Sequence, residues 1–172
     1  MKEKELLLDA NYLIYLLEGS FDESDIELLQ KLKDLRNEIA LDNVEIVTTP
    51  LIRYEFLRYF TWNVQDAEVE RYTTVMNQFT TIDISRDVAD LATNLYRLDK
   101  FEASKNSVNK NIDKRQFDIF HFATAKINGI ELLSNDKHLP QLEGLYNLYK
   151  LDKIIFFSSR RRHTRSLRDW SS

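Results

Sequence analysis

The stretch ELLLDANYLIYLLEG, residues 5–19, decides how the rest of the sequence is interpreted. Leu6, Leu7 and Leu8 form a short apolar run typical of a buried strand, and the residues after it follow the spacing of an amphipathic helix. Asp9 stands where the pattern changes. A carboxylate is costly to bury unless a partner compensates its charge, so Asp9 either reaches a surface or lies beside a positive group. It could also cap the helix that follows, because Asp is a favoured N-cap residue.

Composition limits the function classes that the chain can belong to. The 172 residues are enough for one domain with a hydrophobic core. The absence of cysteine excludes disulfides and thiolate zinc sites, and three glycines far apart in the sequence exclude glycine-rich phosphate loops. Since no apolar run approaches the roughly 18 residues of a membrane span, and Asp9 interrupts the first one too early for a signal peptide, we expect a cytoplasmic protein with no membrane partner.

The last fifteen residues, 158–172, differ sharply from the rest of the chain. The segment SSRRRHTRSLRDWSS holds five of the chain's arginines, which is typical of a disordered basic tail that contacts nucleic acid. It also resembles the translation of sequencing-adapter DNA, and we therefore expect a non-native, disordered tail. Without it, the net charge changes from −4 to −8, so any nucleic-acid contact must be local.

Alternating apolar patterns predict an α/β fold for residues 1–157. Strands are expected at residues 5–9, 44–49, 80–84, 130–134 and 153–157. Helices are expected at residues 11–18, 23–40, 51–62, 64–79, 85–96 and 116–127. Residues 100–115 are polar and look like a loop. Strands separated by helices favour a mainly parallel sheet with helices on both faces.

Two acidic residues follow predicted strands. Asp9 ends the first strand, and Asp136 lies shortly after the apolar run 130–133. The carboxyl ends of parallel strands meet at one edge of a sheet, where such folds bind ligands, so we expect the two carboxylates to lie close together. The Ser-Asn-Asp sequence around Asp136 is also good turn chemistry, which leaves a purely structural interpretation open.

Two further acids lie within predicted helices. Asp118 shares a helical face with Phe122 and Ala125, where a solvated charge is hard to explain. Glu55 stands among aromatic residues, and it could be no more than an exposed salt-bridge partner of Arg58.

These four motifs together resemble the PIN-domain nucleases, and among them the VapC-like toxin ribonucleases. They are LLLDANYLIYLLEG, TTPLIRYEFLRYF, FDIFHFATA and ELLSNDKHL, in this order within residues 5–157. The resemblance implies a three-layer α/β/α sandwich over residues 1–157 and a metal-dependent endoribonuclease that leaves a 5′-phosphate and a 3′-hydroxyl. It also implies an antitoxin partner and a homodimer. His121 and Phe122 depart from the family pattern, which has smaller or aliphatic residues there, and we expect this departure to affect only local packing.

The resemblance assigns Asp9, Glu55, Asp118 and Asp136 to catalysis and metal binding. Carboxylates brought together repel one another, and a divalent cation relieves that repulsion. Oxygen ligands suit Mg²⁺ or Mn²⁺. We expect Asp9 and Asp118 to be the principal ligands, Glu55 and Asp136 to act as second-site or water-mediated ligands, and no histidine to be one. The side chains expected to orient the carboxylates or the water are Asn11 and Ser134.

The substrate surface is less sharply defined. Residues 100–115 carry a local excess of positive charge, which could hold RNA phosphates or form a solvated loop. The candidate RNA contacts are Lys105, Lys110, Lys114 and Arg115. A second set of aromatic side chains is too numerous for one helical stripe, so some should be core and others a dimer or antitoxin surface. These are Tyr54, Phe56, Tyr59, Phe60 and Trp62. Two other functions stay open: RNA maturation or decay without an antitoxin, and a non-catalytic module that binds RNA or protein.

Overall fold

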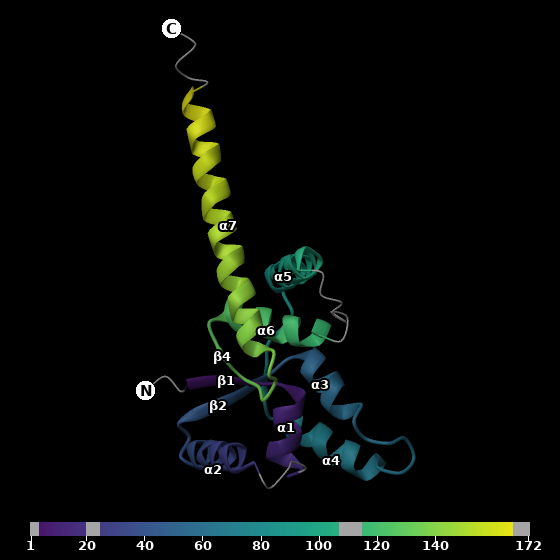
Figure 1. The fold of residues 1–172 in the computed structure, drawn as a ribbon. Coiled ribbons are helices and arrows are strands. Elements are labelled where there is room, and N and C mark those ends of the chain that lie inside the picture. Colours follow the sequence, from purple (N-terminus) through teal and green to yellow (C-terminus); the bar gives the residue numbers. More distant parts are fainter. Residues whose placement is uncertain (1–3, 20–24, 107–114, 167–172) are drawn as a thin grey trace.

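A four-stranded parallel sheet forms the centre of the molecule (Figure 1). The computed structural model of the protein describes residues 4–19, 25–106 and 115–166, with side chains up to residue 154. The strands are β1 (Lys4–Leu8), β2 (Val44–Thr48), β3 (Thr80–Thr81) and β4 (Glu131–Leu133). Their order is β3-β2-β1-β4, and every pairing is parallel. The predicted parallel sheet is therefore confirmed, with β1 between β2 and β4.

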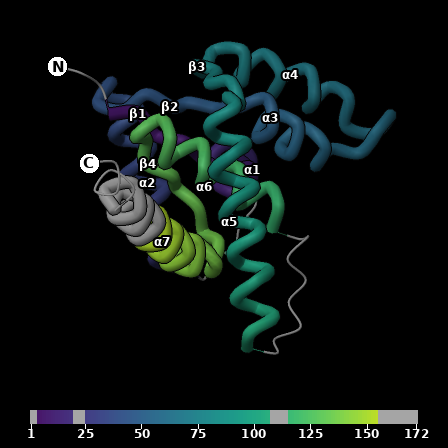
Figure 2. Tube along the Cα trace, turned by 90° about the horizontal axis from the view of Figure 1, so that it is seen from above, coloured from purple at the N-terminus to yellow at the C-terminus, as the bar shows by residue number. Residues whose placement is uncertain are grey.

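Helices cover the sheet in two layers. They are α1 (Ala10–Leu17), α2 (Ile26–Ala40), α3 (Pro50–Leu57), α4 (Asp66–Met76), α5 (Arg86–Lys105), α6 (Gln116–Asn128) and α7 (Leu139–Ser166). The first four share one hydrophobic cluster with the sheet, and α5, α6 and α7 share another. Seen from above, α5 and α7 lie over the sheet on the side away from α2 (Figures 1 and 2). The predicted α/β/α sandwich is confirmed.

Local sequence signals fix where several helices begin and end. The side chain of Thr49 caps α3 by accepting from the amide of Ile52 at 3.1 Å, and Pro50 occupies the first helical turn. Ser85 caps α5 through the amide of Val88 at 3.3 Å. Gly129 ends α6 in the left-handed conformation, with φ of 67°, which glycine adopts without strain. These signals place the helix ends close to where the sequence predicts them.

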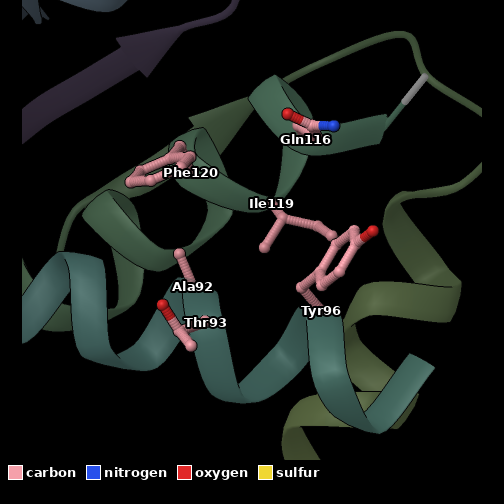
Figure 3. Close-up of a pocket in the computed structure, with 6 residues that line it drawn as sticks. All are labelled: Ala92, Thr93, Tyr96, Gln116, Ile119 and Phe120. Atoms are coloured by element: carbon pink, nitrogen blue, oxygen red, sulfur yellow. The ribbon is translucent and has the colours of Figure 1, made fainter. Parts of the chain in front are cut away.

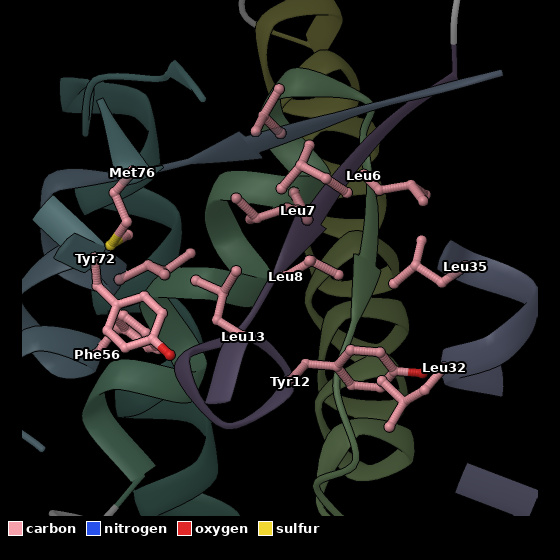
Figure 4. Close-up of a cluster of buried hydrophobic side chains, with 14 of the residues drawn as sticks. Leu6, Leu7, Leu8, Tyr12, Leu13, Leu32, Leu35, Phe56, Tyr72 and Met76 are labelled. Carbon is pink, nitrogen blue, oxygen red and sulfur yellow. The ribbon is translucent and has the colours of Figure 1, made fainter. Parts of the chain in front are cut away.

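The position of β1 in the core explains why its sequence is a continuous apolar run. Leu7 and Leu8 are completely buried because β1 lies between two other strands and under both helical layers. In the first cluster, Tyr12 of α1 points toward Leu32 of α2, and Phe56 of α3 packs at the other side (Figure 4). Burying side chains of this size stabilises the fold by about 1.5–3 kcal/mol each.

The structure corrects three predicted elements. Residues 153–157 are not a strand but part of α7, because the helix that begins at Leu139 continues through them and packs Leu142, Leu145 and Tyr149 against the second cluster. Strand β3 covers only Thr80–Thr81 rather than 80–84, since the chain turns toward the cap of α5 after the amide of Ile82 bonds Thr48. Helix α5 reaches Lys105, so the first part of the predicted loop 100–115 is helical.

Helix α7 also extends to Ser166, into the segment expected to be a disordered tail. That the tail is disordered in solution stays a prediction. That residues 158–172 are non-native stays a prediction. In the part of the chain that the structure describes, we find no helix with the length and apolarity needed to cross a membrane.

Candidate active site

Asp9 joins the end of β1 to the start of α1. Its Oδ1 accepts a hydrogen bond from the amide of Tyr12 at 2.6 Å, so the predicted N-cap role is confirmed. Its own amide donates to the carbonyl of Leu133 at 3.1 Å, which ties this position to the end of β4. Asp9 is only 6% exposed. The cap contact occupies one carboxylate oxygen and leaves the other for a further role.

Asp136 and Ser134 form a turn after β4. The amide of Asp136 donates to Ser134 Oγ at 3.0 Å, and Oδ1 of Asp136 accepts from the amide of His138 at 2.8 Å. The turn interpretation of Asp136 is therefore correct, and it coexists with a place beside the other acids. The Ser134 hydroxyl also hydrogen-bonds the Asp9 carboxylate, which is the contact that its predicted orienting role requires.

Asp118 and Glu55 reach the same region from helices α6 and α3. Asp118 shares a side-chain hydrogen bond with Asp136. Glu55 contacts the ring of His121, and its other oxygen lies 3.9 Å from Arg58. The predicted ion pair with Arg58 thus exists, but Arg58 is half exposed while Glu55 is 13% exposed, so Glu55 also faces inward.

Two adjoining cavities bring these carboxylates together. The larger, of about 270 Å³, is lined by Asp9, Glu55 and Asp118, together with Asn11, Arg58, Tyr59 and His121. The second is much smaller, and among its lining residues are Asp9, Asp118, Ser134 and Asp136. Asp9, Asp118 and His121 line both. Residues far apart in the sequence therefore meet at the carboxyl edge of the sheet, as the sequence predicts.

Burial raises the pKa of two of these carboxyl groups. Burial raises the pKa of Asp118 to about 7, and its hydrogen bond with Asp136 and the charge of that neighbour act in the same direction. Burial also raises the pKa of Asp9, although the hydrogen bonds from Ser134 and Tyr12 partly oppose it. At neutral pH, Asp118 is therefore protonated for part of the time, and the protonated carboxyl can donate a hydrogen bond to Asp136.

The model of the PIN domain family matches residues 6–145. The chain belongs to the PIN domain family. PIN domains are generally nucleases. This PIN domain matches none of the curated proteins. It is similar to VapBC2 from Rickettsia felis, solved bound to a DNA fragment of its promoter, with 14% identity, a TM-score of 0.53, and coverage of 80% of this chain and 92% of that one. It is also similar to a toxin–antitoxin complex from Klebsiella pneumoniae, with 19% identity, a TM-score of 0.46, and coverage of 76% and 86%.

The carboxylate oxygens gathered at this site of the PIN domain are the kind of ligand that a hard divalent cation prefers. Four carboxylates converge, and the raised pKa of Asp118 gives it a proton that a cation could replace. Among the described residues, no three acidic or histidine side chains are grouped closely enough to hold a metal as they stand. A cation at this site would therefore have to displace the proton of Asp118.

His121 is the residue of this region that the sequence did not assign to the site. We expected it to affect packing alone, but it is 3% exposed, contacts Glu55 and lines both cavities. A signal was present in the sequence: His121 lies three residues after Asp118, so both side chains project from the same face of α6.

The structure places the four predicted RNA contacts in different environments. Arg115 is 7% exposed and pairs with buried Asp99 at 3.4 Å, so it does not reach a surface where RNA could bind and this prediction is wrong. Lys105 is exposed at the end of α5, where it pairs with Glu102, and its contact with RNA stays a prediction. Lys110 and Lys114 lie outside the described residues.

Another cavity, of about 250 Å³, lies between α5 and α6 (Figure 3). Its lining residues are Ala92, Thr93, Tyr96, Gln116, Ile119 and Phe120. None of these side chains is charged, and none of the four candidate carboxylates lies here.

Proposed function

We propose that this PIN domain is a metal-dependent endoribonuclease that hydrolyses RNA phosphodiester bonds and acts as the toxin of a toxin–antitoxin pair. The observation that carries the proposal is the convergence of four carboxylates on adjoining cavities, where burial and the neighbouring Asp136 raise the pKa of Asp118. A cluster of repelling acids costs stability, and a cation-dependent activity is a physical reason for a chain to keep it.

Asp9 and Asp118 would be the principal ligands of Mg²⁺ or Mn²⁺, and Glu55 and Asp136 would complete the site directly or through water. When bound, the cation would neutralise charge that develops on the phosphate and help a water molecule to lose its proton. Asp118 must first give up its own proton. Ser134 holds the Asp9 carboxylate in place, and Asn11, on the wall of the larger cavity, is available to orient the attacking water. The expected products carry a 5′-phosphate and a 3′-hydroxyl.

Arg58 gives the larger cavity a positive charge at its edge. It lines the cavity, is half exposed, and lies over the rings of Tyr54 at 5.5 Å and Phe117 at 5.3 Å. An RNA phosphate that approaches the acids would meet this guanidinium first. Lys105 belongs to the same proposal, as a more distant contact.

The proposed antitoxin and homodimer contacts rest on exposed apolar side chains and on the fold shared with VapBC2 of Rickettsia felis. Phe56 and Phe60 of the aromatic set are core residues, but Tyr54, Tyr59 and Trp62 are at least half exposed. Aromatic side chains at the surface are typical of protein interfaces. These three exposed side chains, in and just after α3, form a surface that a partner protein could cover.

A cleavage assay tests the enzymatic part of this proposal. Purified protein is incubated with single-stranded and structured RNA and Mg²⁺ or Mn²⁺; cleavage should stop with EDTA and fall at least about 100-fold in Asp9→Asn and Asp118→Asn, beyond the loss typical of outer-shell changes. Asp90→Asn, an exposed change on α5, is the matched control. Cleavage that persists in either site variant would rule out the assigned ligands.

A growth assay tests the toxin part separately. Expression of the wild-type protein should arrest growth, and co-expression of the product of the neighbouring gene should relieve the arrest. A protein that cleaves RNA without arresting growth would instead be a maturation or decay nuclease.

A further inference from the structure

His121 is a buried polar side chain in a place where packing alone would favour an apolar one. Its side chain is 3% exposed, and its neighbours on α6, Phe122 and Ala123, belong to the second hydrophobic cluster. Burying an imidazole costs free energy unless its nitrogens find partners. Nε2 of His121 has one, because it contacts Oε2 of Glu55. The contact joins α6 to α3 across the larger cavity.

The direction of this hydrogen bond follows from the chemistry of the two groups. A carboxylate that binds a cation is ionised and has only acceptor atoms, so the contact with Glu55 then requires a proton on Nε2 of His121, which donates. The lone pair that a metal would need on Nε2 is then absent. His121 can therefore hold Glu55, but it cannot bind a cation through the same nitrogen while it does so.

No other contact of Glu55 in the described residues could fix it as firmly. Its second oxygen lies 3.9 Å from Arg58, whose side chain is 51% exposed, and an exposed ion pair at that distance constrains a side chain weakly. The contact with His121 is almost completely buried on the histidine side. Glu55 is thus held from the inside of the cavity, by a residue one helical turn from Asp118.

We propose that His121 is a positioning residue that holds the Glu55 carboxylate in place for the divalent cation, and so sets the affinity of the site for metal. This inference rests on the proposed function, which makes Glu55 a ligand. Helix α6 then contributes twice: Asp118 supplies a carboxylate, and His121 fixes the carboxylate that α3 supplies. Outer-shell hydrogen bonds of this kind orient ligands at metal sites and are worth about 10- to 100-fold in metal affinity.

The test measures Mn²⁺ affinity, not activity. The Kd is obtained from the free Mn²⁺ signal in electron paramagnetic resonance for the wild type, His121→Met and His121→Gln. The two substitutions are matched in length, but glutamine keeps a donor for Glu55 and methionine does not. His121→Met should weaken Mn²⁺ binding about 10- to 100-fold, and His121→Gln should stay closer to the wild type. Equal Kd values for all three proteins would overturn the proposal.

A double-mutant cycle shows whether His121 acts through Glu55. In Glu55→Gln protein, adding His121→Met should change the Kd by no more than about twofold, because the interaction that His121 supports is already lost. If the Kd of the double variant instead rises by the product of the two single-variant increases, the two residues act independently, and the positioning role is contradicted.

A spectroscopic measurement gives a readout that is independent of the Kd values. Electron spin-echo modulation of bound Mn²⁺ should show no directly bound nitrogen of His121. A nitrogen signal that disappears in His121→Met would make the histidine itself a ligand and overturn the proposal. Wild-type protein that binds no Mn²⁺ at all would instead refute the proposed function, so the two failures can be told apart.

Discussion

Replacing Asp118 by asparagine should stabilise the metal-free protein at the same time as it abolishes metal binding. Burial and the neighbouring Asp136 raise the pKa of Asp118 from 3.8 to about 7. A carboxyl group whose pKa is higher in the folded than in the unfolded protein stabilises the fold fully at a pH below its pKa in the unfolded protein. This stabilisation is lost as the pH rises through its pKa in the folded protein. The wild-type protein should therefore lose stability between about pH 4 and pH 7.

The size of this effect follows from the same two pKa values. Each unit of difference between the two pKa values of Asp118 corresponds to about 1.4 kcal/mol, so the loss of stability from pH 4 to pH 7 is at most about 4 kcal/mol. Because the side chain is partly exposed, solvent screening reduces that figure, and we expect about 1–2 kcal/mol. Asparagine carries no charge at any of these pH values, and its amide can still donate to Asp136. Asp118→Asn should thus match the wild type below about pH 4, exceed it by less than about 1 kcal/mol near pH 5, and exceed it by about 1–2 kcal/mol near pH 8.

Urea denaturation in EDTA between pH 5 and pH 9 measures this difference. The wild-type midpoint should fall as the pH rises toward 8, and the Asp118→Asn midpoint should fall less; a residual slope is expected because the pKa of Asp9 is raised as well. Asp90→Asn, on the surface of α5, should follow the wild type. Adding Mg²⁺ at pH 8 to 100 times its Kd should stabilise the wild type by about 2.7 kcal/mol but not Asp118→Asn. An Asp118→Asn protein that is less stable than the wild type at pH 8 would refute the reasoning.

Three further outcomes are expected. Cleavage at subsaturating Mg²⁺ should decline as the pH falls below about 7, because Asp118 takes up its proton again; a pH–rate profile that is flat from 6 to 8 would contradict this. Ser134→Ala removes the hydroxyl that bonds Asp9 and should lower cleavage about 10- to 100-fold, whereas Ser104→Ala, at the exposed end of α5, should leave the rate unchanged. Phe56→Ala empties a completely buried position and should lower the free energy of unfolding by about 3–5 kcal/mol in urea titrations; a loss below 1 kcal/mol would show that the first cluster is not packed as described.

The sheet could be predicted because its signals are local. The apolar run that ends at Asp9 and the β-branched run that ends before Pro50 each have strand length and a clear boundary, and the intervening helix forces a parallel crossover. The run KIIFF, residues 153–157, has the same composition but continues a helix. Short apolar runs fit either structure, and this one continues a helix whose earlier turns, with Leu142, Leu145 and Tyr149, pack against the second cluster.

The convergence of the acidic side chains could be predicted from the sequence, but the side chains that contact them could not. Asp9 and Asp136 were placed by strand ends, a property that the sequence displays directly. Arg115 was misplaced because its partner, Asp99, lies sixteen residues earlier on another helix, and no local pattern reveals that burial. The role of His121 was missed for the same reason, since Glu55 reaches it from α3, 66 residues away in sequence.

The location of bound manganese tests the central claim most directly. A crystal of the wild-type protein grown at or above pH 8 with Mn²⁺ should give an anomalous scattering peak between the carboxylates of Asp9 and Asp118, with Glu55 and Asp136 on its edge. The Asp118→Asn protein, crystallised in the same way, should lack the peak. Manganese bound elsewhere, or no peak at a concentration that supports RNA cleavage, would contradict the account.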